Sequence, residues 1–89
     1  MKVYVVYQLG YDGTNILEIL GVYKNVRFAE DKYFEQIRAN IKEFDFGFDK
    51  ECNDFVLDNT TRMTRLFKGG YQENWDNYLE IYIQEQEVK

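Results

Sequence analysis

Histidine and proline are absent from this chain of 89 residues, and cysteine occurs only once, at Cys52. Without histidine, the chain lacks the side chain that most often acts as a general base at neutral pH. A single cysteine excludes an intramolecular disulfide and the Cys/His zinc sites, and its acidic neighbours oppose the thiolate that a nucleophile needs. We therefore expect a protein that is not an enzyme and that carries no cofactor.

Long apolar runs and targeting patterns are also missing. No stretch approaches the roughly 20 apolar residues that span a bilayer, and strand-like alternation begins directly after Met1-Lys2 without a signal-peptide pattern. These features predict a cytoplasmic protein that does not bind membranes. With 45% hydrophobic and 30% charged residues, the chain is expected to fold as a single domain over residues 1–89 rather than to be disordered.

Alternating apolar and polar residues predict β-strands near both ends of the chain. Residues 2–9 and 16–23 lie on either side of a turn cluster with Asp12-Gly13 at its centre, a pattern typical of a β-hairpin. Residues 78–86 alternate again and predict the last strand. Gly21 interrupts the second strand and indicates a bulge or a close contact with the helix at that point.

The middle of the chain predicts one helix and a less regular segment. Apolar residues recur with helical spacing from 26 to 44, and Asn25 is the expected N-cap. An irregular acidic loop is expected over 45–54. The short apolar run Phe55-Val56-Leu57 predicts a third strand, which residues 61–67 either extend or follow as a strand of their own.

This order of elements, ββαββ, predicts an α+β fold: an antiparallel four- to five-stranded sheet with one long helix packed on one face. The apolar side of the helix carries Ala29, Tyr33, Ile37 and Ile41. It is expected to cover the sheet face formed by Val3, Val5, Leu17, Ile19, Leu79, Ile81 and Ile83.

The opposite sheet face is the first candidate for function, because one helix cannot cover both faces. Alternation places Tyr4, Leu20, Val22 and Tyr82 together on it. Exposed apolar surface rich in tyrosine commonly marks a contact site, so we predict that these four residues bind a partner. Three alternatives stay open: residues 55–75 fold back over this face, its scattered apolar residues simply stay exposed without binding anything, or a small molecule binds there.

The net charge is −5, and acidic residues concentrate in the segment 43–58. An acidic surface suits a basic partner, which makes four carboxylates the second set of candidate binding residues: Asp45, Asp49, Glu51 and Asp54. They do not match the EF-hand spacing, and an opportunistic divalent-cation site is the alternative. Arg62, Arg65 and Lys68 form the only basic cluster near aromatic residues. We expect them to pair with the protein's own acids rather than with phosphate.

Four short segments follow one another through the first half of the chain. They are Val3-Tyr4-Val5-Val6, Asp12-Gly13, Leu20-Gly21-Val22-Tyr23 and then Ala29 early in the helix. Over residues 2–45 this pattern resembles small uncharacterised domains of bacteria and their phages, which pair such a hairpin with one helix and a return strand. The resemblance implies a fold but no activity and no site. A composition rich in Lys, Asn, Asp, Tyr and Ile also fits the AT-rich genome of a phage or mobile element.

From these features we expect a non-enzymatic protein-interaction module. In this interpretation it is a phage or mobile-element accessory protein that binds and modulates a host protein with a basic surface. A homodimer is a second possible partnership. The alternative function is binding of single-stranded nucleic acid on the aromatic sheet face, although the acidic net charge disfavours nucleic acid.

Overall fold

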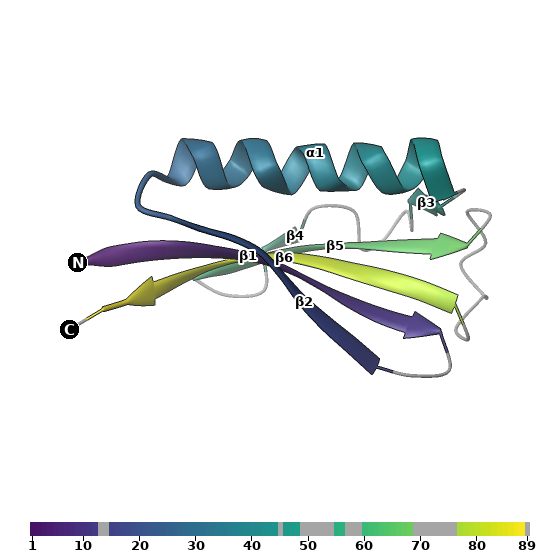
Figure 1. Cartoon of the computed structure of the whole chain (residues 1–89), viewed down its shortest axis with the longest axis horizontal. Helices are drawn as coiled ribbons and strands as arrows, with labels where there is room; N and C mark the ends of the chain where they lie inside the picture. Colours follow the sequence, from purple (N-terminus) through teal and green to yellow (C-terminus); the bar gives the residue numbers. More distant parts are fainter. Residues whose placement is uncertain (13–14, 45, 49–54, 57–59, 69–76, 89) are drawn as a thin grey trace.

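The computed structural model describes residues 1–12, 15–44, 46–48, 55–56, 60–68 and 77–88. Over these residues the fold is α+β, as the sequence predicts. It has two layers: the helix α1 (Val26–Phe44) lies along one face of an antiparallel sheet (Figure 1). The two ends of the chain lie side by side, where the backbone N–H of Val88 donates to the Met1 carbonyl at 2.7 Å.

Six strands make up the sheet in the part of the chain that is described, in the order β2-β1-β6-β5-β3, with β4 paired to β5 off this path. Every pairing is antiparallel. The strands are β1 (Lys2–Asp12), β2 (Asn15–Tyr23), β3 (Phe46–Phe48), β4 (Phe55–Val56), β5 (Thr61–Lys68) and β6 (Asn77–Glu87). The hairpin strand β1 therefore lies beside the last strand, and β2 lies at one edge of the sheet.

The element boundaries confirm most of the sequence interpretation. The helix begins and ends where its periodicity predicts, and the hairpin and the last strand are each present. Strand β5 is a separate strand that pairs with β4. One expectation is wrong: Phe46–Phe48, assigned to an irregular loop, is the strand β3 and pairs with the end of β5. Three residues are too few to show a period, and their pairing is set by a distant strand.

The start of the helix is capped as expected. The Asn25 side-chain oxygen Oδ1 accepts a hydrogen bond from the backbone N–H of Arg27 at 2.8 Å. The Asn25 carbonyl accepts the first helical bond, from the N–H of Ala29 at 3.3 Å. Asparagine suits this position because its short side chain satisfies an amide that has no partner within the helix.

The helix and the sheet meet in one apolar core. On the helix, Ala29, Tyr33 and Ile37 are buried and Ile41 is partly buried against them. The sheet contributes four buried side chains from three adjacent strands: Val6 of β1, Leu66 of β5, and Ile81 and Ile83 of β6. The Tyr33 hydroxyl and the Thr64 Oγ1 lie 2.6 Å apart within this core, so its polar atoms are hydrogen-bonded.

The hairpin presents the opposite face to the helix from the one predicted. Val6 is fully buried in the core, and Tyr4 and Leu20 pack against it, whereas Leu17 and Ile19 are more than half exposed on the far side. The face that receives the helix carries Gln8 and Glu18 and is the less apolar of the two, so alternation shows which residues share a face, but the apolar character of a face does not show which one receives the helix. The prediction for β6 is confirmed, since Ile81 and Ile83 are buried in the core.

A β-bulge in β2 contributes to this error. Val6 pairs with Gly21 and the next residue, Tyr7, pairs with Ile19, which leaves Leu20 as the extra residue. Strict alternation therefore fails across the bulge, and Val22 lies on the same face as Ile19 instead of with Leu20. The bulge predicted at Gly21 is present next to it, whereas the close approach at this glycine is to ring atoms of Tyr23 in the same strand, 2.6 Å from where a Cβ would lie, and not to the helix.

Replacing Ile37 by aspartate tests the helix–sheet contact. Ile37 is 4% exposed, and Ile37→Asp would bury a carboxylate among apolar side chains. We expect a loss of several kcal/mol, on the order of the whole free energy of unfolding, measured by urea unfolding. The control is Arg38→Asp, a change at the next residue, which is exposed. An Ile37→Asp variant that unfolds at the same urea concentration as Arg38→Asp would contradict this packing.

Removing the Asn25 cap is expected to lower the free energy of unfolding by less than the Ile37→Asp change. Asn25→Ala removes the side-chain acceptor for the Arg27 amide, and we expect it to lower the free energy of unfolding by about 1 kcal/mol. Asn25→Asp keeps an acceptor and should restore most of that loss. If alanine and aspartate at this position are equally stable, the cap does not stabilise the helix.

Candidate interaction face

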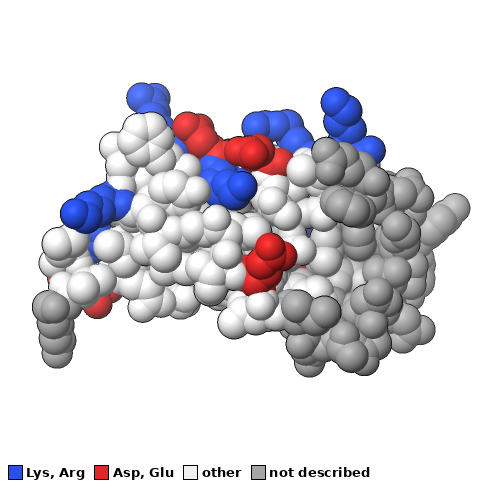
Figure 2. Space-filling model, in the orientation of Figure 1, with Lys and Arg blue, Asp and Glu red and all other residues white. Residues whose placement is uncertain are grey.

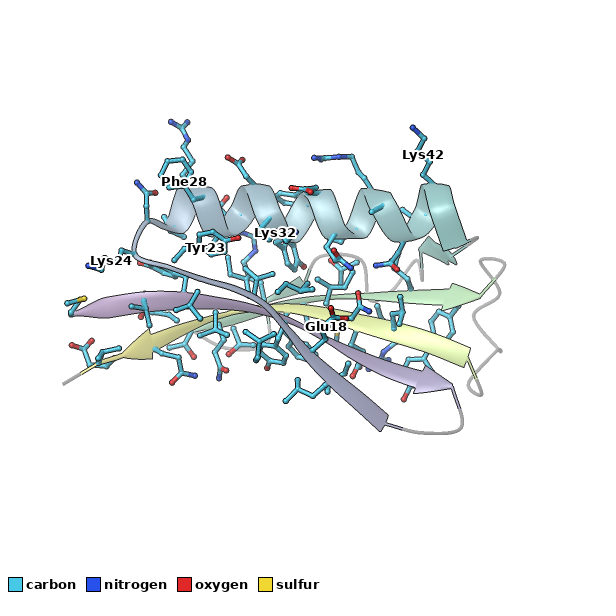
Figure 3. All side chains as sticks on the ribbon, in the orientation of Figure 1. Glu18, Tyr23, Lys24, Phe28, Lys32 and Lys42 are labelled. Carbon is cyan, nitrogen blue, oxygen red and sulfur yellow. The ribbon has the colours of Figure 1, made fainter. Side chains whose placement is uncertain are left out.

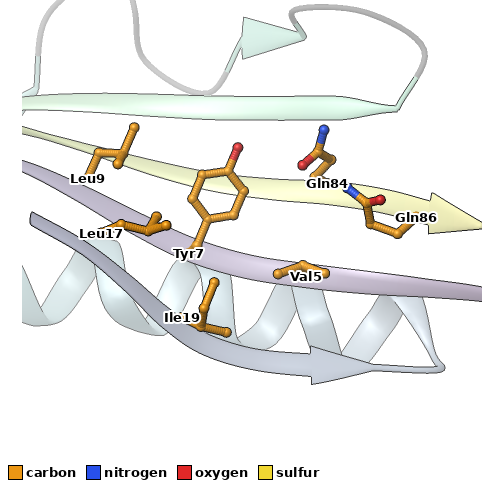
Figure 4. A pocket seen from close by; sticks show the side chains of 7 residues that line it. All are labelled: Val5, Tyr7, Leu9, Leu17, Ile19, Gln84 and Gln86. Carbon is orange, nitrogen blue, oxygen red and sulfur yellow. The ribbon is translucent and has the colours of Figure 1, made fainter.

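An open groove of about 450 Å³ lies on the side of the sheet that faces away from the helix. Figure 4 looks onto this side, with the helix behind the sheet. The groove is lined by Val5, Tyr7, Leu9, Leu17, Ile19, Gln84 and Gln86. We call these seven residues, together with the neighbouring Val22, the open face.

Strand register explains why these residues share one face. In the β1–β2 pair, Val5 lies opposite Val22, and in the β1–β6 pair it lies opposite Gln84. Two residues along β1, Tyr7 lies opposite Ile19 on one side and Tyr82 on the other. Successive residues of a strand point to opposite faces, so these rows all project away from α1.

The apolar side chains of β2 are unusually accessible. Leu17, Ile19 and Val22 are 59%, 56% and 59% exposed. They lie on one strand at the edge of the sheet, where no described residue covers them. Scattered exposed apolar residues are ordinary, but three adjacent ones on one face are typical of a contact surface.

The open face carries no charged side chain. Its polar groups are the Tyr7 hydroxyl and the Gln84 and Gln86 amides. In contrast, many of the charged side chains gather along the helix layer, with a few more over the strands (Figure 2), and those of the helix include Lys32 and Lys42 (Figure 3). The two sides of the molecule therefore differ in chemistry as well as in exposure.

Toward β5, the side of the sheet that faces away from the helix is less accessible. The Arg65 Nη2 and Nε atoms donate to Oε2 of Glu80 at 2.6 and 2.9 Å, and the Tyr82 hydroxyl donates to Oε1 at 3.1 Å. Met63 and Phe67 on this side are buried. Among the described residues, the most accessible part of this face lies over β2, β1 and the end of β6.

The basic residues pair with acids of the same chain, as predicted. Arg65 pairs with Glu80, and Arg62 lies 3.8 Å from the Glu30 carboxylate of the helix. The Arg62 guanidinium also lies over the Tyr33 ring, 5.6 Å from its centroid. The side chain of Lys68 lies outside what the structure describes.

The predicted patch of Tyr4, Leu20, Val22 and Tyr82 is not one surface. Tyr4 and Leu20 pack against the core under the helix, whereas Val22 is exposed on the other side of the sheet. Tyr82 shares that other side but stacks on Tyr7. The reversed hairpin faces and the bulge at Leu20 account for this difference.

The second predicted set, Asp45, Asp49, Glu51 and Asp54, lies outside the described residues, as does Cys52. Among the residues that are described, no three His, Cys, Asp or Glu side chains come together as metal ligands. The alternatives of a basic partner or a cation at that segment therefore stay predictions.

One polar cluster escapes sequence reasoning. Asn40 on the helix is 4% exposed, and its amide donates to Gln8 Oε1 at 3.1 Å and to the Gln36 carbonyl at 2.9 Å. Gln36 also donates to Gln8, at 3.0 Å. Asn40 falls beside the apolar stripe of the helix, but nothing in the sequence pairs it with Gln8. The cluster is partly buried and joins the helix to the sheet.

Tyr7 is the ionisable group of the open face. Its ring stacks on that of Tyr82, with centroids 4.7 Å apart and an interplanar angle of 5°. Burial raises the pKa of the Tyr7 hydroxyl above the ordinary 10.0, and the Glu80 carboxylate raises it further. The hydroxyl is therefore a neutral donor and acceptor at physiological pH.

This raised pKa predicts a loss of stability in alkaline solution. Above pH 10 the unfolded chain releases the Tyr7 proton more readily than the folded chain, so the free energy of unfolding falls as pH rises. Tyr7→Phe removes this contribution and should make the decline between pH 9 and about pH 11 shallower in urea unfolding. Identical slopes for the two proteins would show that folding does not perturb Tyr7.

No protein-family model, curated protein or solved structure matches the chain. The resemblance to small bacterial and phage domains thus gains no further support. Within the described residues, no helix has the length and apolar character needed to cross a membrane.

Proposed function

We propose that this protein is a non-enzymatic interaction module that binds another protein through the open face. One observation carries the proposal: Leu17, Ile19 and Val22 are each more than half exposed on one neutral surface. Covering such side chains releases water from apolar area, which is the main driving force of association. Leu17 and Ile19 also line the groove, whose concave shape can accommodate side chains of a partner. Tyr7 and the two glutamines can form hydrogen bonds that set the orientation of that partner.

The character of the open face indicates the chemistry of the partner. A surface without carboxylates has nothing to attract a basic protein at close range, so we infer an apolar contact. The expectation of a basic host partner rests on the acidic segment, and the phage or mobile-element origin rests on composition and resemblance. Those two finer points stay hypotheses.

The described residues offer little support for nucleic-acid binding. Tyr7 and Tyr82 stack on each other, so each ring has one face already occupied. Arg65 is the one cation among the described side chains on this side of the sheet, and it is paired with Glu80. Single-strand binders combine several free aromatic faces with a basic groove, and the described residues on this side of the sheet do not form a basic groove.

A double substitution on the open face tests the proposal. Leu17→Thr with Ile19→Thr keeps residues that favour a strand while removing apolar contact area. The full chain, immobilised at low density so that its copies do not meet, captures proteins from a cell lysate. Each captured protein is then purified and its dissociation constant is measured. We expect the double variant to weaken binding by tenfold or more.

Phe28→Gln is the matched control for this experiment. Phe28 is 60% exposed, comparable with Leu17, but it lies on the helix layer (Figure 3). The control should bind like the unaltered chain, and all variants should retain their thermal unfolding midpoints within a few degrees. Equal binding by the double variant and the control would place the functional surface elsewhere.

A further inference from the structure

The open face is electrostatically neutral and its polar groups can pair with copies of themselves. A primary amide such as that of Gln84 or Gln86 both donates and accepts hydrogen bonds, and so does the neutral Tyr7 hydroxyl. A carboxylate or an ammonium group cannot pair with an identical group, and the open face has neither. Apolar side chains are likewise compatible with themselves. The face is therefore complementary to its own copy.

We infer that the open face docks a second copy of this chain, with the two copies related by a two-fold axis. This inference rests on the proposed function and names its partner. In a two-fold contact the same patch serves both copies, which is the arrangement that a self-complementary patch allows. Packing the two sheets face to face would produce four layers, helix–sheet–sheet–helix, and would cover Leu17, Ile19 and Val22 in both copies.

Face-to-face packing explains the exposure better than pairing along the β2 edge. Edge pairing would engage backbone groups of β2 but leave its exposed side chains in water. The bulge at Leu20 also interrupts the edge, and bulges are a common protection against edge pairing. The exposed side chains project from the face of the sheet, and only another layer on that face covers them.

The dimensions of the molecule set the expected strength. The chain measures 40 × 22 × 21 Å, so one side of the sheet covers roughly 900 Å² and the open face about half of that, about 450 Å². Two copies packed through this face would bury about 900 Å² in total, whereas stable complexes bury roughly 1,200 to 2,000 Å². We therefore expect a weak dimer that forms only at high protein concentration.

Sedimentation velocity of the full chain from about 1 μM to 1 mM tests the inference. Unaltered protein should pass from monomer to dimer over this range, and Leu17→Glu should stay monomeric because it would bring two carboxylates into the contact. Phe28→Glu adds the same charge at an equally exposed position outside the open face and should dimerise like the unaltered chain. Circular dichroism melts confirm that all three proteins are folded.

Salt and contact mapping provide independent readouts. Each copy carries a net charge of −5, so raising the salt concentration should leave the dimer unchanged or strengthen it by screening repulsion. In a sample that mixes two isotope labels, intermolecular NOEs should join methyl groups of Leu17, Ile19 and Val22. NOEs that join only helix residues would overturn the inference even if a dimer forms.

The outcomes separate this inference from the proposed function. A chain that is monomeric at every concentration, or a Leu17→Glu variant that dimerises normally, overturns self-docking. The low-density capture experiment is decided separately, because a foreign partner can bind the open face of a monomer. Loss of capture in the threonine variant together with a monomeric chain would leave the proposed function standing and exclude the second copy.

Discussion

Burial of Tyr33 between helix and sheet is the contact on which the rest of the structure depends. Its ring lies in the core, and its hydroxyl meets Thr64 of β5 at 2.6 Å. A buried hydroxyl without a partner costs about 1 to 3 kcal/mol, so this bond allows a large aromatic side chain to fill the core without penalty. The Arg62 guanidinium of β5 lies over the same ring, 5.6 Å from its centroid, so Tyr33 joins the helix to β5 through two contacts.

The single described helix covers one side of the sheet, so no described helix covers the other side. Over β5 that side carries the buried side chains of Met63 and Phe67, and Glu80 bonds there to Arg65 and to Tyr82. Over β2 and β1 no equivalent cover is present in the described part of the chain, and the apolar residues there stay accessible. The open face is thus a consequence of having one helix for a sheet with two apolar faces, and it is where binding is proposed.

Local patterns and long-range pairing differ in what they reveal before a structure is seen. The helical stripe of Ala29, Tyr33 and Ile37, and the Asn25 cap, depend on neighbours within one element, and both are present as expected. The strand β3 and the cluster of Gln8, Gln36 and Asn40 depend on partners far away in the chain. No local periodicity encodes such pairs, so sequence reasoning did not find them.

The sequence by itself determined the class of fold, the position of the helix and its buried side, and, outside the bulge in β2, the rows of residues that share a strand face. The tertiary structure alone decided which hairpin face receives the helix. Val5 and Val6 are chemically identical, and only the packing of Val6 beside Ile81 and Ile83 distinguishes them. The bulge at Leu20 is decided in the same way, since one unpaired residue is visible only in the register between two strands. The open face depends on both decisions, which is why its location required the structure.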